Sequence, residues 1–359
     1  MRILALALTG VFAVCGTSSA SEPQTASRRV AVDSDTPTDT SATFELATAR
    51  FLFRSSPRVG LLHFLRAWAM ADAGEWPAWA PPLYERSTWP APPGEDGRVW
   101  AEAVEAFAST VDRSPVNDRG LINLRGWAVE ERTRDDVPAA DRHLIDTIER
   151  ALPVYLRHYW RHHDLRNRAF ITSAVPAIEA VEHDVGVHLE RAYGGTWPDR
   201  RIPIDVVAYS NALGAYSTAG RVAITAGDIS HQMPRAIEII IHEASHFDEF
   251  EEPLSRAIEA AWQEAGYGEP PGRLWHDFIF YTTGEATRLA LQARGYDDYQ
   301  HYGAFGLYRR GERWQKELPA FEAHWRPFME GAARPGSGGD PDAARHAALV
   351  AFARDVAGP

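Results

Sequence analysis

The stretch from Ile237 to Phe247 constrains the fold more than any other, because it contains the chain's one H-E-x-x-H pattern. On an α-helix, residues four apart lie one turn apart on the same face, so His242 and His246 can point at one metal ion. Glu243 sits beside that face, where its carboxylate can take a proton from a water molecule. The opposite side of the helix is apolar and suited to burial, with Ile237, Ile240, Ile241, Ala244 and Phe247. The sequence therefore predicts a metal-binding helix that packs its back against the core.

The first twenty residues resemble an export signal. Arg2 is followed by an apolar run, Ile3–Cys15, that is too short to span a bilayer, and then by Ser18-x-Ala20. This order of charge, apolar run and small residues is typical of a signal peptide. We expect cleavage after Ala20 and export to the periplasm or the extracellular space. Cys15 is the only cysteine, so the mature chain would contain no disulfide.

The composition is typical of a globular protein in water, since 45% of the 359 residues are hydrophobic and 24% are charged. The formal net charge is −12 and the basic residues form no block. This distribution argues against nucleic acid and anionic membrane surfaces as partners. After the first twenty residues, no apolar segment approaches the length of a transmembrane helix, so we expect no membrane span.

Changes in composition and in hydrophobic periodicity along the sequence divide the chain into five predicted parts. Residues 1–20 are the signal peptide, and residues 21–43, rich in Ser, Thr, Asp and Pro, are a disordered linker. Helical periodicity from Phe44 onward indicates a helical N-terminal region over 44–200. Residues 201–330 form the catalytic region, and residues 331–359 are a Gly/Pro linker and a C-terminal helix.

The catalytic region begins with β-branched, alternating sequence. Residues 202–209 predict a strand, and residues 213–218 and 221–225 predict two more, joined by the turn Ala219-Gly220. Helices are expected after these strands, the longest over about 273–294. The predicted fold class is α+β and mostly helical, with a small antiparallel sheet, the H-E-x-x-H helix and a second helix that bears a glutamate.

Two imidazoles do not complete a catalytic zinc site, which needs three protein ligands and an open position. Glu252 lies six residues after His246, but Glu249 stands where a glycine would let the chain turn back. His276 has suitable chemistry, although on an ideal helix it faces nearly opposite to Glu285.

Glu285 is the preferred third ligand. It lies in the middle of an apolar helix beside Gly284, whose missing side chain would let this helix approach the first one closely. A glutamate in such a helix needs a partner, and a metal ion is a good one. The alternative is a structural ion pair with an arginine such as Arg288.

These motifs resemble a known family. H-E-A-S-H at 242–246, followed by a helix with Gly284-Glu285, resembles the gluzincins, the thermolysin-like clan of zinc metallopeptidases. The hairpin at 214–225 is similar to the edge strand that these enzymes use to hold extended peptides. The resemblance covers about residues 202–325.

The resemblance implies a zincin-like catalytic core, a Zn²⁺ cofactor and a peptide or protein substrate. It implies His242, His246 and Glu285 as zinc ligands and Glu243 as the general base. The family often has an acidic residue four positions after the ligand glutamate, where this chain has Leu289. The residues that would orient the ligand histidines therefore stay open, with Asp248, Asp277 or a backbone carbonyl as candidates.

The tetrahedral oxyanion of such a hydrolysis needs a hydrogen-bond donor besides the metal. Tyr302 is the first choice, because zincins of this type often place a tyrosine or histidine after the third ligand. The candidates that stay open are His301, Tyr299, His276, His231 and Arg288.

Two further clusters received a structural interpretation. The polar run from His158 to Asn167 can form a second metal or substrate subsite, but a solvated amphipathic helix is the better interpretation. The tryptophans between Trp76 and Trp89 can stack on sugars, although such residues more often pack loops.

The sequence thus predicts an exported zinc metallopeptidase in which Glu243 acts on a water molecule at the zinc. The alternatives are a metal-dependent amidase that acts on envelope material and a non-catalytic binding protein stabilised by zinc.

Overall fold

The computed structural model describes residues 42–78, 80–83, 85–86, 91–309, 311–332 and 340–358. All of them belong to one compact unit, Asp39–Pro359. The predicted signal peptide, nearly all of the predicted linker at 21–43 and most of the Gly/Pro linker after residue 331 lie outside the described residues. In the described part of the chain, no helix is both long and apolar enough to cross a membrane.

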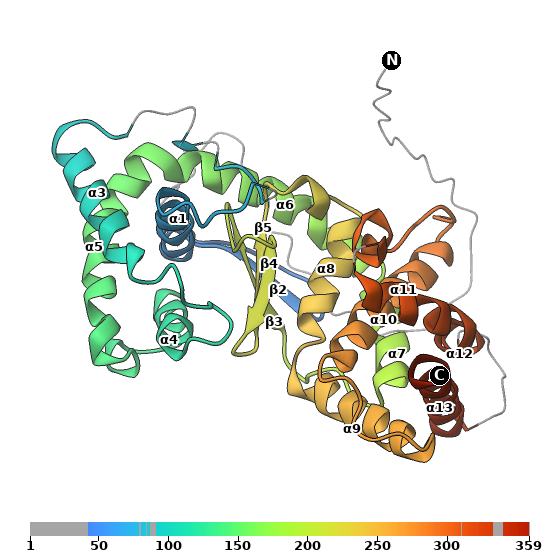
Figure 1. Cartoon of the computed structure of the whole chain (residues 1–359). Helices are drawn as coiled ribbons and strands as arrows, with labels where there is room; N and C mark the ends of the chain where they lie inside the picture. The colour runs from blue at the N-terminus through green and yellow to red at the C-terminus, as the bar shows by residue number, and fades with distance from the viewer. Residues whose placement is uncertain are drawn as a thin grey trace, which may run out of the picture. The chain divides into compact units, whose positions relative to one another are not determined.

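A five-stranded sheet of mixed direction lies at the centre (Figure 1). Its order is β1-β2-β3-β5-β4, with bounds Phe44–Ala47 (β1), Phe51–Ser55 (β2), Ile202–Val207 (β3), Arg221–Thr225 (β5) and Ala215–Thr218 (β4). Strands β2, β3 and β5 are parallel, whereas β1 and β4 run antiparallel to their neighbours at the two edges. The prediction of an antiparallel sheet is therefore wrong. The hairpin after β3 places its second strand, β5, beside β3, and this makes the β3–β5 pair parallel.

Strands β1 and β2 correct the prediction of helix from Phe44 onward. Along β2, buried and half-buried residues alternate, with Phe51 and Phe53 fully buried. This period of two is that of a strand with one face on the core. Phe51 pairs with Ile202 and Phe53 with Ile204, so the sheet crosses the predicted boundary at residue 200.

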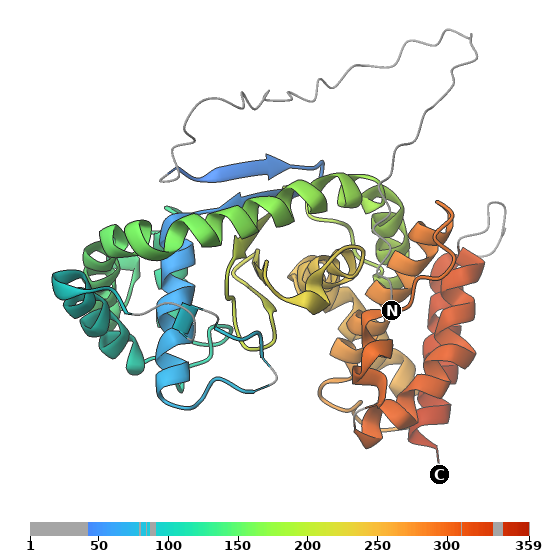
Figure 2. The same cartoon turned by 90° about the horizontal axis from the view of Figure 1, so that it is seen from above.

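Two groups of helices pack around the sheet, each with its own hydrophobic core. The first group contains α1 (Pro57–Asp72), α3 (Gly94–Ala108), α4 (Arg119–Ala128) and α5 (Arg142–Tyr155). A π-helical turn, Leu156–Trp160, joins α5 to the long helix α6 (Arg161–Glu179), which runs along the sheet (Figure 2). The prediction of helices in the N-terminal region is thus confirmed for the residues that follow β1 and β2.

The second group of helices contains the H-E-x-x-H motif. It consists of α7 (Glu182–Tyr193), α8 (Arg235–Ala244), α9 (Asp248–Glu264), α10 (Leu274–Gln292), α11 (Glu312–Ala320), α12 (Arg326–Ala332) and α13 (Pro341–Ala357). A π-helical turn, Phe321–Trp325, joins α11 to α12. The predicted C-terminal helix, α13, packs against α9 and belongs to this core.

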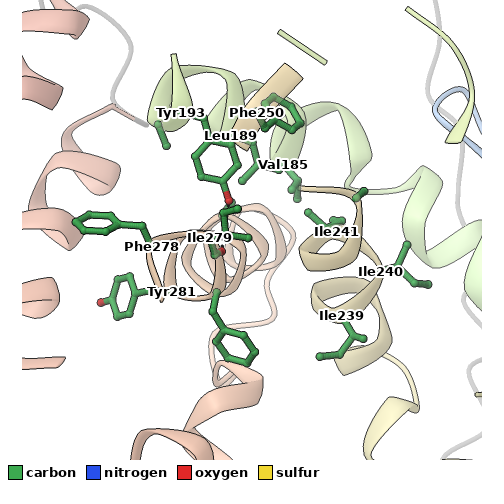
Figure 3. Close-up of a cluster of buried hydrophobic side chains, with 14 of the residues drawn as sticks. Val185, Leu189, Tyr193, Ile239, Ile240, Ile241, Phe250, Phe278, Ile279 and Tyr281 are labelled. Atoms are coloured by element: carbon green, nitrogen blue, oxygen red, sulfur yellow. Dashed lines mark hydrogen bonds between the residues drawn. The ribbon is translucent and has the colours of Figure 1, made fainter. Parts of the chain in front are cut away.

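The apolar back of the motif helix is buried as predicted. The five predicted residues are all buried, namely Ile237, Ile240, Ile241, Ala244 and Phe247. Figure 3 shows Ile240 and Ile241 of α8 in the same hydrophobic cluster as Phe278 and Ile279 of α10. Each fully buried side chain of this size contributes roughly 1.5–3 kcal/mol relative to an exposed one. Packing of this kind holds α8 in place in the core, and this fixes the position of its polar face.

Candidate metal centre

The end of α8 brings the two motif histidines together. The amide of Ser245 donates to the carbonyl oxygen of Ile241 at 2.9 Å, so the helical turn continues past Ala244 and includes His246. The Nε2 atoms of His242 and His246 are 3.2 Å apart. Two ring nitrogens at this distance face the same point in space, as the spacing of the motif predicts.

Helix α10 supplies a third imidazole from its first turn. The His276 ring centroid lies 5.2 Å from that of His242 and 5.1 Å from that of His246. One potential ligand atom from each of the three residues lies within 4.8 Å of the others. The three histidines therefore form a group that can hold a metal ion.

This group suits zinc in distance and in protonation. Zinc–nitrogen bonds of about 2.0–2.1 Å in a tetrahedral site put two ligand nitrogens about 3.3–3.4 Å apart, close to the distance observed between His242 and His246. Burial lowers the pKa of His242 well below its usual value and lowers the pKa of His246 to about 4 and that of His276 to about 3. All three rings are therefore neutral at pH 7, the form that binds metals.

The structure does not bring Glu285 to this group. Its carboxylate is fully buried and paired with Arg288, whose Nε donates to Oε2 at 2.8 Å, and His301 Nε2 lies 3.0 Å from the same oxygen. His276 and Glu285 are nine positions apart in the sequence, and this spacing places them on opposite faces of α10. The structure thus places His276 rather than Glu285 beside the two motif histidines, and the ion pair with Arg288 explains how the carboxylate is buried.

The remaining sequence candidates for ligands and their supports lie elsewhere. Glu252 is exposed and pairs with Arg256 at 3.1 Å. Asp277 is buried, but its Oδ1 accepts from Arg313 at 2.5 Å rather than from a ligand histidine. His242 Nδ1 is buried and has no hydrogen-bond partner among the residues that the structure describes.

Glu243 lies between the histidine group and the sheet. Burial raises the pKa of its carboxyl to about 7, although hydrogen bonds from Ser217 and the charge of Arg125 act in the opposite direction. Ser217 belongs to β4, so the Glu243 carboxylate is directed toward the edge strand. A carboxyl that titrates near neutrality can accept and return a proton, which is the task of a general base.

A cleft of about 1570 Å³ opens onto this site. Its lining includes all three histidines, Glu243 and the whole of β4, Ala215–Thr218. The cleft therefore exposes the candidate metal centre to a substrate considerably larger than a single amino acid.

Strand β4 turns main-chain groups toward the cleft. The amide of Thr225 donates to the carbonyl oxygen of Gly214 at 2.8 Å, and hydrogen-bonded pairs alternate along an antiparallel ladder. The N–H and C=O groups of Ala215 and Ser217 therefore face away from β5. Two of these groups already have partners, because the Ala215 carbonyl oxygen accepts from Asn211 Nδ2 at 3.1 Å and the Ser217 N–H donates to the Glu243 carboxylate. The two-residue turn has positive φ at both Ala219 and Gly220, as hairpins of this length require.

Tyr302 lines the cleft, as the prediction of an oxyanion donor requires. Its hydroxyl donates to Ser230 Oγ at 3.3 Å, and its ring lies 6.1 Å from that of His231, which also lines the cleft. His301 is buried against Glu285, and Tyr299 donates its hydroxyl to Glu238. Tyr302 and His231 thus remain candidate donors, whereas His276 belongs to the metal group.

Sequence reasoning ranked His276 too low and did not consider Ser217. The only local signal for His276 is an imidazole in the first turn of an apolar helix, at the end that faces the motif helix. The signal for Ser217 is its place in a short hairpin that precedes the motif, where a polar side chain faces the helix after it.

The polar run from His158 to Asn167 does not gather at one point. His158 pairs with Asp96, whereas His163 is fully buried and lies 3.0 Å from Glu85. Asn167 donates to Ser55 in β2. The run forms several separate structural contacts and is helical, but the interpretation as a solvated helix is wrong for His163, Asp164 and Asn167, which are buried. In the tryptophan segment, the indole N–H of Trp76 donates a hydrogen bond to the carbonyl oxygen of Pro81 at 2.9 Å.

Comparisons of the chain with protein-family models, with curated proteins and with solved structures gave no match.

Proposed function

We propose that this protein is a zinc-dependent hydrolase that cleaves peptide bonds in extended polypeptide segments. The observation that carries the proposal is the group of three neutral imidazoles beside Glu243, at the floor of a cleft that an edge strand borders. Three protein ligands with an open position are typical of catalytic zinc, whereas structural zinc sites have four.

In this proposal His242, His246 and His276 hold the zinc ion, which supplies Lewis-acid chemistry to the water and to the scissile carbonyl. Glu243 accepts the proton of the attacking water and later returns it to the leaving amine. Tyr302 donates its hydroxyl hydrogen bond to the oxyanion that develops on the carbonyl. Ser217 holds the Glu243 carboxylate by hydrogen bonds, and the charge of Arg125 favours its ionised form.

The edge strand supports a polypeptide as the substrate. The Ala215 N–H and the Ser217 C=O can pair with an extended chain in a short ladder, which is the mode of β-strand addition. Such a ladder recognises the peptide backbone and is independent of side-chain identity. An amide in a small or branched molecule would leave these groups unused, and this favours a peptidase over an amidase.

The likeness to the gluzincins is limited to part of the site. It extends to the H-E-x-x-H helix and to the edge strand, but a third histidine takes the place of the ligand glutamate. The proposed chemistry does not depend on this difference, because imidazole and carboxylate both complete catalytic zinc sites.

The test combines metal analysis with an unbiased peptide-cleavage screen of the mature protein. We expect about one zinc per chain and cleavage that EDTA abolishes and zinc restores. Glu243→Gln should retain the metal and lose at least 10²-fold in kcat, because general-base catalysis contributes about 10²–10⁴-fold. Full turnover by Glu243→Gln would refute the mechanism, and zinc binding without any cleavage of peptides would favour a binding protein.

A further inference from the structure

Residues 299–302 follow α10 and return the chain to the cleft. This segment, called here the 299–302 segment, contains Tyr299, His301 and Tyr302. It contacts both helices that carry the candidate metal ligands, α8 and α10, through two buried carboxylates. One of these belongs to Glu238 and the other to Glu285.

Glu238 ties the segment to α8. It lies one turn before His242 and is 1% exposed. A single oxygen, Oε2, accepts from the Tyr299 hydroxyl at 2.7 Å and from the Tyr302 amide at 2.8 Å. Two donors on one short segment fix both its position and its direction relative to the motif helix.

Glu285 ties the segment to α10. Its Oε2 lies 3.0 Å from His301 Nε2, and the other ring nitrogen of His301 lies 3.1 Å from the Tyr308 hydroxyl. Burial acts to raise the pKa of Glu285, but Arg288 and His301 outweigh it and hold the value at about 2. The carboxylate is therefore ionised and serves as a fixed acceptor between the helix and the segment.

Gly284 marks the point where α8, α10 and the segment meet. A Cβ atom at this position would stand 2.8 Å from His301 Cγ and 3.0 Å from Glu238 Oε1. Carbon atoms do not approach so closely, so any side chain here would push the segment away from α10. The helix position next to Glu285 therefore requires glycine for a close approach, not for backbone conformation.

The segment ends at a residue that reaches the cleft. The ring of Tyr302 lies 6.2 Å from that of Phe280, which in turn lies 4.9 Å from the His242 ring. Among the residues that the structure describes, the hydrogen-bond partner of the Tyr302 hydroxyl is Ser230, at the long distance of 3.3 Å. A weakly bonded hydroxyl on a firmly anchored backbone is suited to donate to a substrate, because its present partner is easily exchanged.

We propose that Glu238 and Glu285 are positioning residues that anchor the 299–302 segment to the two metal-binding helices and thereby aim the Tyr302 hydroxyl at the substrate. This inference rests on the proposed hydrolytic function. It gives Glu285 a role at the site that is separate from metal binding.

The test is a double-mutant cycle between Gly284→Ala, which displaces His301, and Tyr302→Phe, which removes the hydroxyl. Gly331→Ala is the matched control, because no atom of the described residues lies within 4 Å of the place where its Cβ would stand. Zinc content, kcat and KM are measured for each variant. Hydrogen exchange of the peptide that contains Tyr302 reports the anchoring without any turnover.

We expect Gly284→Ala to retain zinc and KM, to lower kcat by about 10–100-fold and to accelerate exchange at the Tyr302 amide. Loss of one oxyanion donor costs about 10²–10³ in kcat, so Tyr302→Phe should fall in that range. In the Tyr302→Phe background, Gly284→Ala should lower kcat no further, and Gly331→Ala should match the wild type throughout.

Multiplicative losses in the double variant, or loss of zinc from Gly284→Ala, would overturn the inference. Unchanged exchange in Gly284→Ala would also overturn it. If the wild type cleaves no peptide, the proposed function fails and the catalytic role of Tyr302 with it. Faster exchange in Gly284→Ala would then show that the anchoring of the segment is nevertheless real.

Discussion

His63 provides a quantitative prediction about stability and pH. It lies in α1 with 3% of its surface exposed. Its Nδ1 is 2.8 Å from the carbonyl oxygen of Val59, and its Nε2 is 2.8 Å from the hydroxyl oxygen of Tyr216 in β4. A neutral imidazole satisfies both contacts by donating from Nδ1 and accepting at Nε2. Burial, reinforced by the charge of Arg125, lowers the pKa of this ring from 6.5 to about 4.

The direction of the effect follows from proton binding. Between about pH 6.5 and pH 4 the unfolded chain binds a proton at His63 and the folded chain does not, so the free energy of unfolding decreases as the pH falls. For a shift of this size, the linkage relation gives a loss of about 2 kcal/mol between pH 7 and pH 5. The full loss below the folded-state pKa is about 3.4 kcal/mol.

The assay is urea unfolding of the metal-free protein and of His63→Gln at several pH values. Other histidines with lowered pKa values titrate in both proteins, and their contributions cancel in the difference. We expect the stability advantage of the wild type over the variant to shrink by about 2 kcal/mol from pH 7 to pH 5. It should stay constant from pH 7 to pH 8.5, where the ring is neutral in both states. A difference that is independent of pH between 7 and 5 would refute the assignment of His63 as a buried neutral ring.

Three further predictions concern the metal, the edge strand and a buried ion network. His276→Ala should weaken zinc binding by at least 10²-fold in a chelator competition, whereas Glu285→Gln should leave the zinc stoichiometry unchanged; the reverse pattern would restore Glu285 as the ligand. N-methylation of a cleaved peptide at backbone positions that pair with β4 should raise its KM by about 5–10-fold per lost hydrogen bond, because each bond contributes about 1 kcal/mol. Equal KM values for the methylated and unmethylated peptides would exclude strand addition. Asp205→Ala should lower the free energy of unfolding by about 3–5 kcal/mol, because it leaves Arg125 and Arg221 buried without their shared carboxylate; a loss below 1 kcal/mol in urea unfolding would contradict this.

The sequence by itself determined the local features of the site. The four-residue spacing of His242 and His246 fixes their common face on any helix, and the apolar residues behind them fix which face is buried. The strand pattern of 202–225 and the turn at Ala219-Gly220 are likewise local, because alternation and positive φ depend on neighbouring residues. These features appear in the structure where the sequence predicts them.

The strand order was not accessible from the sequence. Nothing local in Phe51–Ser55 says that it pairs with a strand that begins 147 residues later, at Ile202. The direction of pairing between β3 and β5 depends on which strand of the hairpin lies inside the sheet. Both choices satisfy the same local pattern, and packing of the helices on the two faces decides between them.

The third ligand was decided by tertiary structure for the same reason. Helical periodicity shows that His276 and Glu285 lie on opposite faces of α10, but not which of these faces meets α8. The choice depends on how Phe278 and Ile279 pack against the neighbouring helices. It also depends on His301, which belongs to a later segment and forms a hydrogen bond with the buried carboxylate of Glu285. A glutamate in an apolar helix needs a partner, and the sequence shows this need. Only the folded chain shows that the partners are Arg288 and His301 and that His276 is the residue that lies beside the two motif histidines.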